Sequence, residues 1–225
     1  MVVSDDVSAR AVGRTKKQSY HHGDLPRALV TAALDLIGKR GPEGFTLREV
    51  AAAVGVTHGA AYRHFEDKDA LLAAVAEEGY RLLTQTIARA MSSGVVDPRE
   101  RLRALAAAYV EFVMDQPARY RVMWGPRLNE SGRFPSLAAA IADSFAILVA
   151  ELERGQSVGA FRDEPSARDL AVVFWVTAHG YVGLVLGRRI KVKSNSVAVA
   201  YFDQLLTPLL DGLATKSAPK RAAKR

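Results

Sequence analysis

The chain of 225 residues is 49% hydrophobic and 24% charged, which provides enough apolar material for a globular core in one or two domains. It contains no cysteine, so disulfides, thiolate metal sites and cysteine nucleophiles are excluded, and a reducing cytoplasmic location is expected. The formal net charge of +7 lies at the two ends, because residues 23–213 are neutral as a whole.

The charge pattern predicts a flexible basic N-terminal arm over residues 1–22 and a disordered basic tail over residues 214–225. Such clusters attract phosphate, but they also serve as solubilising tails, and the sequence leaves both interpretations open. The first residues lack an apolar stretch of signal-peptide length, so export is not expected.

The chain is predicted to be helical almost throughout. Apolar residues three and four positions apart follow the candidate N-cap Asp24 and end at Gly41, which indicates an amphipathic first helix. A long helix is predicted after the candidate cap Asp67. Three prolines are expected at the starts of further helices and two at breaks near the end of the chain: Pro98, Pro117 and Pro135, then Pro165 and Pro208. No convincing strand pattern appears, so the predicted fold class is all-α.

Residues 46–65, TLREVAAAVGVTHGAAYRHF, combine small side chains with two glycines. A helix-turn-helix needs small residues where its helices cross and a glycine of positive φ in the turn. Ala51, Gly55 and Ala61 meet these needs, with a first helix after the cap Thr46 and a second over about residues 58–65 after Thr57. The N-terminal turn of the second helix would then meet base edges in a DNA major groove.

A tight helical corner that never touches DNA is the alternative. Residues 23–78 hold six basic and nine acidic side chains, so their net charge does not favour DNA. Any binding must therefore come from one face, formed by Arg48, Arg63 and Lys68 together with the basic N-terminal arm.

The stretch FTLREVAAAVGVTHGAAYRHFEDKDALLAAV, residues 45–75, resembles the DNA-binding domain of the tetracycline-repressor (TetR) family, and the resemblance extends back to about His21. It implies base-facing or groove-facing positions at Arg48, Thr57, His58 and Gly59. It implies phosphate-contacting positions at Thr46, Tyr62, His64 and Lys68. Only His58 offers a base-reading side chain at the start of the second helix, so the operator sequence stays open.

The resemblance implies a three-helix helix-turn-helix DNA-binding domain over residues 23–68 and a helical effector-binding and dimerisation domain over residues 69–213. It further implies a homodimer that binds double-stranded DNA at a palindromic operator, acts as a repressor and is released by an unknown small-molecule effector. No cofactor and no membrane association are expected.

The fragment WVTAHG, residues 175–180, resembles the Trp-x3-His-Gly signature of a TetR-type C-terminal domain. Trp175 and His179 lie one helical turn apart, and they could line an effector pocket or simply fill the core. The candidate pocket residues, each of which could equally be core, are Tyr109, Phe112, Met123, Trp124, Phe145, Trp175 and His179.

The last two helices are predicted over about residues 166–188 and 196–213, and by family analogy they would pair with their copies in a four-helix dimer interface. Glycines and apolar side chains would permit close approach there. The candidate interface residues are Phe174, Tyr181, Gly183, Val185 and Gly187.

Two other interpretations remain. Residues 170–187 are uncharged and long enough to span a membrane, which would make the chain a membrane-anchored DNA-binding regulator. His21, His22 and Asp24 could ligate a metal in a helical enzyme, but adjacent histidines point apart and no further cluster has ligand spacing. No catalytic residue, metal or enzymatic activity is therefore expected.

Overall fold

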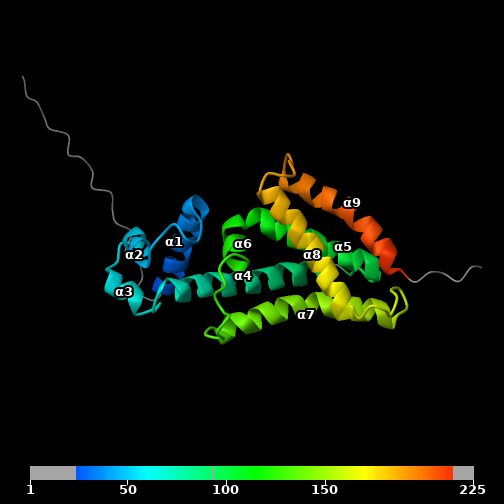
Figure 1. Ribbon diagram of the computed structural model, residues 1–225, viewed down its shortest axis with the longest axis horizontal. Coiled ribbons are helices and arrows are strands. Elements are labelled where there is room, and N and C mark those ends of the chain that lie inside the picture. Colours follow the sequence, from blue (N-terminus) through cyan, green and yellow to red (C-terminus); the bar gives the residue numbers. More distant parts are fainter. Residues whose placement is uncertain (1–23, 93, 215–225) are drawn as a thin grey trace, which may run out of the picture.

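The computed structural model describes residues 24–92 and 94–214, and in this part of the chain every regular element is a helix (Figure 1). The helices are α1 (Leu25–Arg40), α2 (Leu47–Val54), α3 (His58–Tyr62), α4 (Lys68–Met91), α5 (Pro98–Asp115), α6 (Pro117–Met123), α7 (Pro135–Ser157), α8 (Ala167–Leu186) and α9 (Asn195–Leu213). The all-α prediction is confirmed. The predicted arm over residues 1–22 lies outside the described residues, as does the predicted tail beyond Ala214.

The helices are arranged along one long axis. Figure 1 shows α1, α2 and α3 clustered at one end, and α4 running from this cluster into a larger group of helices. There α4 packs against α5, α6 and α7, while α8 lies against α5 and α7, and α9 lies mainly along α5. The helix α4 is therefore part of both ends of the molecule.

Several helix boundaries follow directly from local chemistry. The first residues of α5, α6 and α7 are Pro98, Pro117 and Pro135, as predicted. Proline is favoured there because the first amide of a helix has no partner within the helix, so its absence in proline costs nothing. The side chain of Asp67 caps α4 by accepting a hydrogen bond from the Ala70 amide at 2.8 Å.

One predicted break and one predicted boundary are wrong. The predicted helix over about residues 196–213 is present as α9, but Pro208 does not break it, because Leu206 and Leu210, both fully buried, hold the helix against the core on either side. The helix α3 ends at Tyr62 instead of residue 65. The next residues form a turn in which the buried Phe65 folds back toward the core.

Buried apolar side chains from all nine described helices form one continuous cluster, and no polar or charged residue is fully buried in the described part of the chain. On α4 the inward side chains recur every three or four positions, as a helix covered on one side requires. The small helical end and the larger group of helices therefore share one core.

Two helices, Pro135–Ser157 and Ala167–Leu186, are long and apolar enough to cross a membrane by length and composition alone. Core helices of folded proteins pass the same test. Both helices are packed against neighbours here, with α7 on α4 and α5, and α8 on α5 and α7.

A shielded ion pair joins α5 to α7. The Arg101 guanidinium donates two hydrogen bonds to Glu151, at 2.7 and 2.6 Å, and the two side chains are only 18% and 12% exposed. Arg101 also donates to the backbone oxygens of Met91 and Val95, at 3.3 and 3.0 Å. Arg101 holds the pKa of Glu151 below its ordinary value, against the opposing effect of burial.

We expect Glu151→Gln to lower the free energy of unfolding by about 1 to 3 kcal/mol at neutral pH, because it leaves the Arg101 charge without its partner. The lowered pKa of Glu151 means that the stability from this pair is present above the unfolded-state pKa and is lost as pH falls through the folded-state pKa. Urea titrations of the unsubstituted protein and of Glu151→Gln between pH 7 and pH 3.5 should show that the difference in their free energies of unfolding decreases as the pH is lowered.

Glu153→Gln is the matched control, because Glu153 lies on the same helix, is exposed and forms no ion pair with a described residue. A Glu151→Gln variant as stable as this control at pH 7 would contradict the role of the pair.

Candidate functional site

The turn between α2 and α3 has the tight geometry expected of a helix-turn-helix. Gly55 adopts φ 80° and ψ 25°, the left-handed conformation, and its amide donates to the Ala52 oxygen at 3.0 Å. The Val56 amide donates to the Ala51 oxygen at 3.0 Å, which completes the helix end. Ala51 and Ala61 are 1% and 0% exposed, so α2 and α3 cross where neither carries a large side chain.

The start of α2 is locked by reciprocal hydrogen bonds. The Thr46 amide donates to Glu49 Oε2 at 2.8 Å, and the Glu49 amide donates to Thr46 Oγ1 at 3.3 Å. Arg40, at the end of α1, donates to Glu49 Oε1 at 2.8 Å and lowers the pKa of Glu49. The Thr46 hydroxyl lies 3.0 Å from Glu49 Oε2, so it is already used within the protein.

At the start of α3, the hydroxyl group of Thr57 is available to an outside partner. Thr57 Oγ1 accepts a hydrogen bond from the Ala60 amide at 3.3 Å, so its proton can still be donated outward. The rings of His58 and Tyr62 meet edge to face at 6.3 Å, and Tyr62 is 45% exposed. Arg48 and Arg63 are exposed and form no hydrogen bond or ion pair with any described side chain.

The structure therefore brings eight of the nine candidate DNA-contacting residues together on an exposed surface around α2 and α3. We call these eight residues the α2–α3 face: Thr46, Arg48, Thr57, His58, Gly59, Tyr62, Arg63 and His64. Lys68 differs, because its Nζ donates to the Glu43 oxygen at 3.2 Å and lies 4.8 Å from the centre of the Phe45 ring. Its side chain is 25% exposed and braces the loop before α2.

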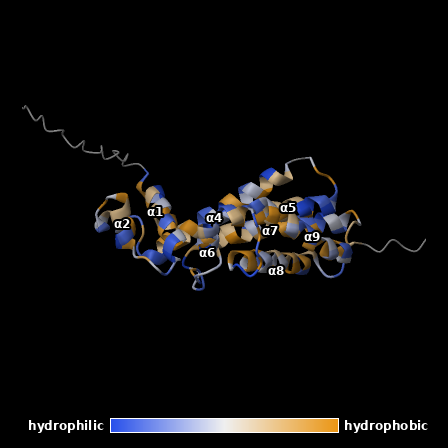
Figure 2. Ribbon diagram, turned by 90° about the horizontal axis from the view of Figure 1, so that it is seen from above, coloured by the Kyte–Doolittle hydropathy of each residue, from blue (hydrophilic) through white to orange (hydrophobic). Residues whose placement is uncertain are grey.

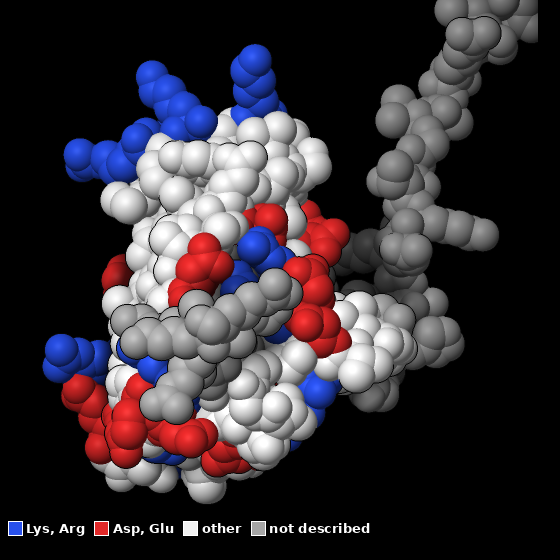
Figure 3. All heavy atoms as spheres, turned by 90° about the vertical axis from the view of Figure 1, so that its right-hand side faces the viewer, with Lys and Arg blue, Asp and Glu red and all other residues white. Residues whose placement is uncertain are grey.

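A second group of basic side chains lies elsewhere. The loop between α8 and α9 carries Arg188, Arg189, Lys191 and Lys193, all exposed. Figure 3, which faces the end opposite α1–α3, shows Lys and Arg side chains projecting from the top, where Figure 1 places this loop. This loop is well separated from α3.

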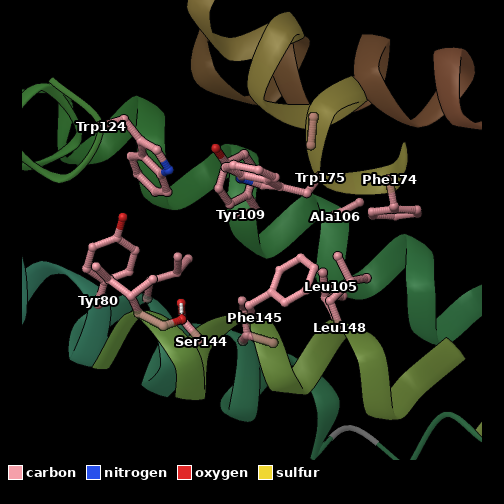
Figure 4. A pocket seen from close by; sticks show the side chains of 14 residues that line it. Tyr80, Leu105, Ala106, Tyr109, Trp124, Ser144, Phe145, Leu148, Phe174 and Trp175 are labelled. Atoms are coloured by element: carbon pink, nitrogen blue, oxygen red, sulfur yellow. Dashed lines mark hydrogen bonds between the residues drawn. The ribbon is translucent and has the colours of Figure 1, made fainter. Parts of the chain in front are cut away.

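A cavity of about 150 Å³ lies among α4, α5, α7 and α8, and Figure 4 shows aromatic side chains converging on it from several sides. Four of the seven candidate pocket residues line it, namely Tyr109, Trp124, Phe145 and Trp175. The remaining lining residues are Tyr80, Leu83, Ile87, Leu105, Ala106, Ile141, Ser144, Leu148, Phe174 and Ala178.

Three candidate pocket residues do not line this cavity. Phe112 and Met123 are buried, at 3% and 7% exposure, but they fill other parts of the core. His179 lies behind the cavity wall, with Nδ1 3.1 Å from the Tyr120 hydroxyl and 3.4 Å from the Tyr109 hydroxyl. Its ring also packs against those of Trp124 and Trp175 at 5.5 and 5.8 Å.

The groups around the cavity are uncharged at neutral pH. Burial raises the pKa of Tyr80 and of Tyr109 well above the ordinary value, and it raises the pKa of Tyr120 to about 12. Burial also lowers the pKa of His179. No acidic or basic side chain of the described chain lines the cavity.

The fourth helix was expected to form part of the pocket wall, but the residues it contributes were not named from the sequence. Tyr80, Leu83 and Ile87 line the cavity at spacings of three and four residues. That spacing predicts a buried helix face but cannot tell which buried residues border an empty volume. Only the packing of α5, α7 and α8 around α4 leaves the space open.

The outer surface of α8 and α9 differs from the predicted dimer interface. Phe174, Tyr181 and Val185 are 2%, 5% and 8% exposed and point into their own protomer, where the Tyr181 hydroxyl donates to the Ala198 oxygen at 2.7 Å. These three side chains therefore cannot reach a second copy in this structure. Gly183 and Gly187 are exposed.

The exposed apolar residues on these two helices form a different set, which we call the α8–α9 outer face, and Figure 2 shows much of α8 coloured as hydrophobic. Its members are Val172, Val173, Trp175, Val176, Leu184, Val197, Tyr201 and Leu205.

The residues considered for a metal are not brought together. His21 and His22 lie outside the described residues. Over residues 24–92 and 94–214, no group of three or more His, Asp or Glu residues is placed to hold a metal ion.

A helix-turn-helix with an exposed basic face, joined by one long helix to a bundle that contains an apolar cavity, defines the class of helix-turn-helix transcriptional regulators. Comparison with known families identifies which one. Residues 29–75 match the model described as bacterial regulatory proteins, tetR family, and residues 102–209 match the tetracyclin repressor-like C-terminal domain. The chain belongs to the TetR family of transcriptional regulators.

Individual relatives agree with this assignment. An HTH-type transcriptional repressor of Mycobacterium tuberculosis is 32% identical over 81 residues, which is 36% of this chain and 43% of the repressor. The chain thus spans about two fifths of the length of the first curated relatives it matches.

Solved structures share the whole fold. A protein with unknown function from Rhodococcus sp. RHA1 is 30% identical, with a TM-score of 0.73 over 88% of this chain and 100% of that one. The transcriptional regulator FadR from Bacillus subtilis, solved in complex with stearoyl-CoA, is 16% identical, with a TM-score of 0.69 over 83% of this chain and 98% of FadR.

Two glycines of the helix-turn-helix should respond oppositely to alanine. Gly55→Ala forces a side chain into a left-handed conformation and should lower the free energy of unfolding by about 1 kcal/mol. Gly59 lies in α3 with no atom within 4 Å of an added Cβ, so Gly59→Ala should leave stability unchanged or raise it by up to about 1 kcal/mol. Thermal unfolding followed by circular dichroism checks both, and equal losses would contradict the turn geometry.

Proposed function

We propose that this chain is a cytoplasmic, homodimeric repressor that binds a palindromic operator through the α2–α3 face and is released by a small molecule in the α4–α5–α7–α8 cavity. The proposal rests on two features joined by α4: the exposed α2–α3 face directly precedes this helix, and its residues Tyr80, Leu83 and Ile87 line a ligand-sized cavity. No catalytic step or cofactor is part of it.

The exposed chemistry of α3 supports insertion into a major groove. Its first residues, His58 and Gly59, are exposed, and the absence of a side chain at Gly59 allows close approach to base edges. Arg48 and Arg63 have no intramolecular partner in the described chain and are available for phosphate or guanine. Thr57 can donate its hydroxyl proton to phosphate.

Local hydrogen bonds change the proposed roles of two residues. Lys68 and Thr46 bond to neighbouring protein groups and would have to release them to meet DNA. We therefore assign Lys68 to bracing the loop before α2, and we assign the first contacts with phosphate to Arg48, Arg63 and Tyr62.

The dimer is proposed to form through the α8–α9 outer face. Exposed apolar side chains concentrated on two neighbouring helices are typical of an association surface. A two-fold dimer would present two copies of α3 about 34 to 36 Å apart, one turn of DNA, which requires a palindromic operator.

The proposed coupling runs along α4 and also through the segment that connects α6 to α7. Trp124, at one end of this segment, lines the cavity. Arg133, near the other end, donates to Glu66 at 2.9 Å and to Asp67 at 2.8 Å. Asp67 caps α4 directly after the helix-turn-helix. A ligand that displaces Trp124 can therefore shift the α2–α3 face in two ways, through α4 itself and through the contacts of Arg133.

Arg63→Ala should weaken binding to operator and unrelated DNA alike and reduce the slope of log affinity against log salt by about one, since one phosphate contact is lost. Fluorescence anisotropy with labelled duplexes at several salt concentrations measures this. Arg189→Ala is the control, because it removes the same charge from the α8–α9 loop and should change neither quantity. Equal behaviour of the two variants would refute the proposed docking surface.

Arg133→Ala should loosen the start of α4. Hydrogen exchange of the amides in its first turn, including Ala70, should become several-fold faster, because the carboxylate that caps them loses its partner. Arg127→Ala changes the same segment, where Arg127 pairs only with Glu130, and should leave these rates unchanged. Unchanged exchange rates in Arg133→Ala would show that the contact between Arg133 and Asp67 does not stabilise the first turn of α4.

A further inference from the structure

We infer that the cavity selects an uncharged molecule built on a single aromatic ring with one hydrogen-bond acceptor, and that it rejects carboxylates and long acyl chains. The inference rests on the proposed function only where it calls this molecule the effector. The selectivity itself follows from the size, charge and unused donors of the cavity.

Size sets the first limit. A volume of about 150 Å³ is that of an apolar cavity known to accept benzene. Tyr80 and Ile141 form a wall between this cavity and a second hollow beneath residues 122–130. The Tyr80 hydroxyl donates to the Met123 oxygen at 3.0 Å, which holds the wall in place. A long acyl chain would need this bond to break.

The shape of the lining favours a ring over a flexible chain. Figure 4 shows Trp124 and Tyr80 at one end of the cavity and Phe145 on the opposite side from Tyr109. Trp124 already meets Tyr80 and Tyr109 edge to face, with ring centres 5.4 and 6.0 Å apart. A bound aromatic ring can extend this edge-to-face arrangement, which contributes beyond the area it buries.

Charge sets the second limit. The lining holds no lysine, arginine, aspartate or glutamate, and burial keeps Tyr80 and Tyr109 protonated. His179, the nearest basic group behind the wall, has a lowered pKa and is neutral. A carboxylate carried fully inside this cavity, away from its opening to solvent, would lose its hydration without gaining a counter-charge, a cost of several kcal/mol for a buried ion.

Unused donors define the remaining feature. The hydroxyl of Tyr80 donates to the Met123 oxygen, that of Ser144 donates to the Ile141 oxygen at 2.8 Å, and that of Tyr109 lies 3.4 Å from His179 Nδ1. The indole N–H of Trp124 forms no hydrogen bond with a described residue, and Figure 4 shows it on the side of the ring toward Tyr109. The other lining indole, Trp175, is 38% exposed and belongs to the α8–α9 outer face. Trp124 is the more buried of the two indoles, so we assign it as the donor to a ligand acceptor.

Four probes separate these features: acetophenone, ethylbenzene, benzoate and dodecanoate. Binding to the full chain without DNA is measured by isothermal titration calorimetry at pH 7.5. Acetophenone should bind, ethylbenzene should bind about three- to tenfold more weakly because it lacks the acceptor, and the two carboxylates should not bind at the same concentrations. Benzoate or dodecanoate binding as tightly as acetophenone, or no acetophenone binding at millimolar concentration, would overturn the inference.

Two variants locate the binding. Trp124→Phe keeps a ring but removes the donor, so acetophenone affinity should fall to that of ethylbenzene. Val158→Ala is the control, because Val158 is 64% exposed and belongs to none of the surfaces assigned above, and it should change nothing. Ala106→Leu fills the cavity and should abolish binding of both neutral probes, with circular dichroism confirming the fold. If Trp124→Phe binds acetophenone as the parent does, the donor assignment fails.

DNA binding by each variant without probe is measured separately. Loss of DNA binding with probe selectivity intact would contradict the proposed function and leave the cavity assignment standing. Operator binding with no acetophenone binding would contradict only the cavity assignment.

Discussion

The structure depends on the continuity of α4, which begins directly after the helix-turn-helix and ends beyond the cavity. Its first turn is fixed by the Asp67 cap and its middle carries Tyr80 and Leu83 into the cavity wall. In the proposed mechanism, a shift of α4 at the cavity is transmitted to the start of this helix. Residues from both ends of the molecule belong to the same apolar cluster as α4.

Features set by nearby residues could be predicted from the sequence. The Thr46 cap, the left-handed Gly55 and the proline starts of α5, α6 and α7 each involve residues within a few positions of one another. The exposed helix-turn-helix surface followed from the same local pattern, which is why eight of its nine candidate residues lie together. Lys68 was different, because its partner Glu43 lies 25 positions away and no local rule indicates it.

Features set by packing could not be predicted. The helix α8 is apolar on all sides, so periodicity did not reveal that Phe174, Tyr181 and Val185 face inward while Val172, Val176 and Leu184 face outward. Buried aromatic residues were recognised as core or pocket, but the difference between Phe112 and Phe145 is only whether neighbouring helices fill the adjacent space. Pro208 likewise stays within α9 because tertiary contacts outweigh its local preference.

If the cavity and the α2–α3 face are energetically linked, each ligand must change the affinity of the other by the same factor. The affinity of acetophenone is measured for the free protein and for the protein saturated with a palindromic duplex selected from random DNA. We expect the duplex to weaken acetophenone binding by about fivefold or more, and acetophenone to weaken duplex binding by the same factor. Equal acetophenone affinity for the free and the DNA-bound protein would show that the two sites are not linked.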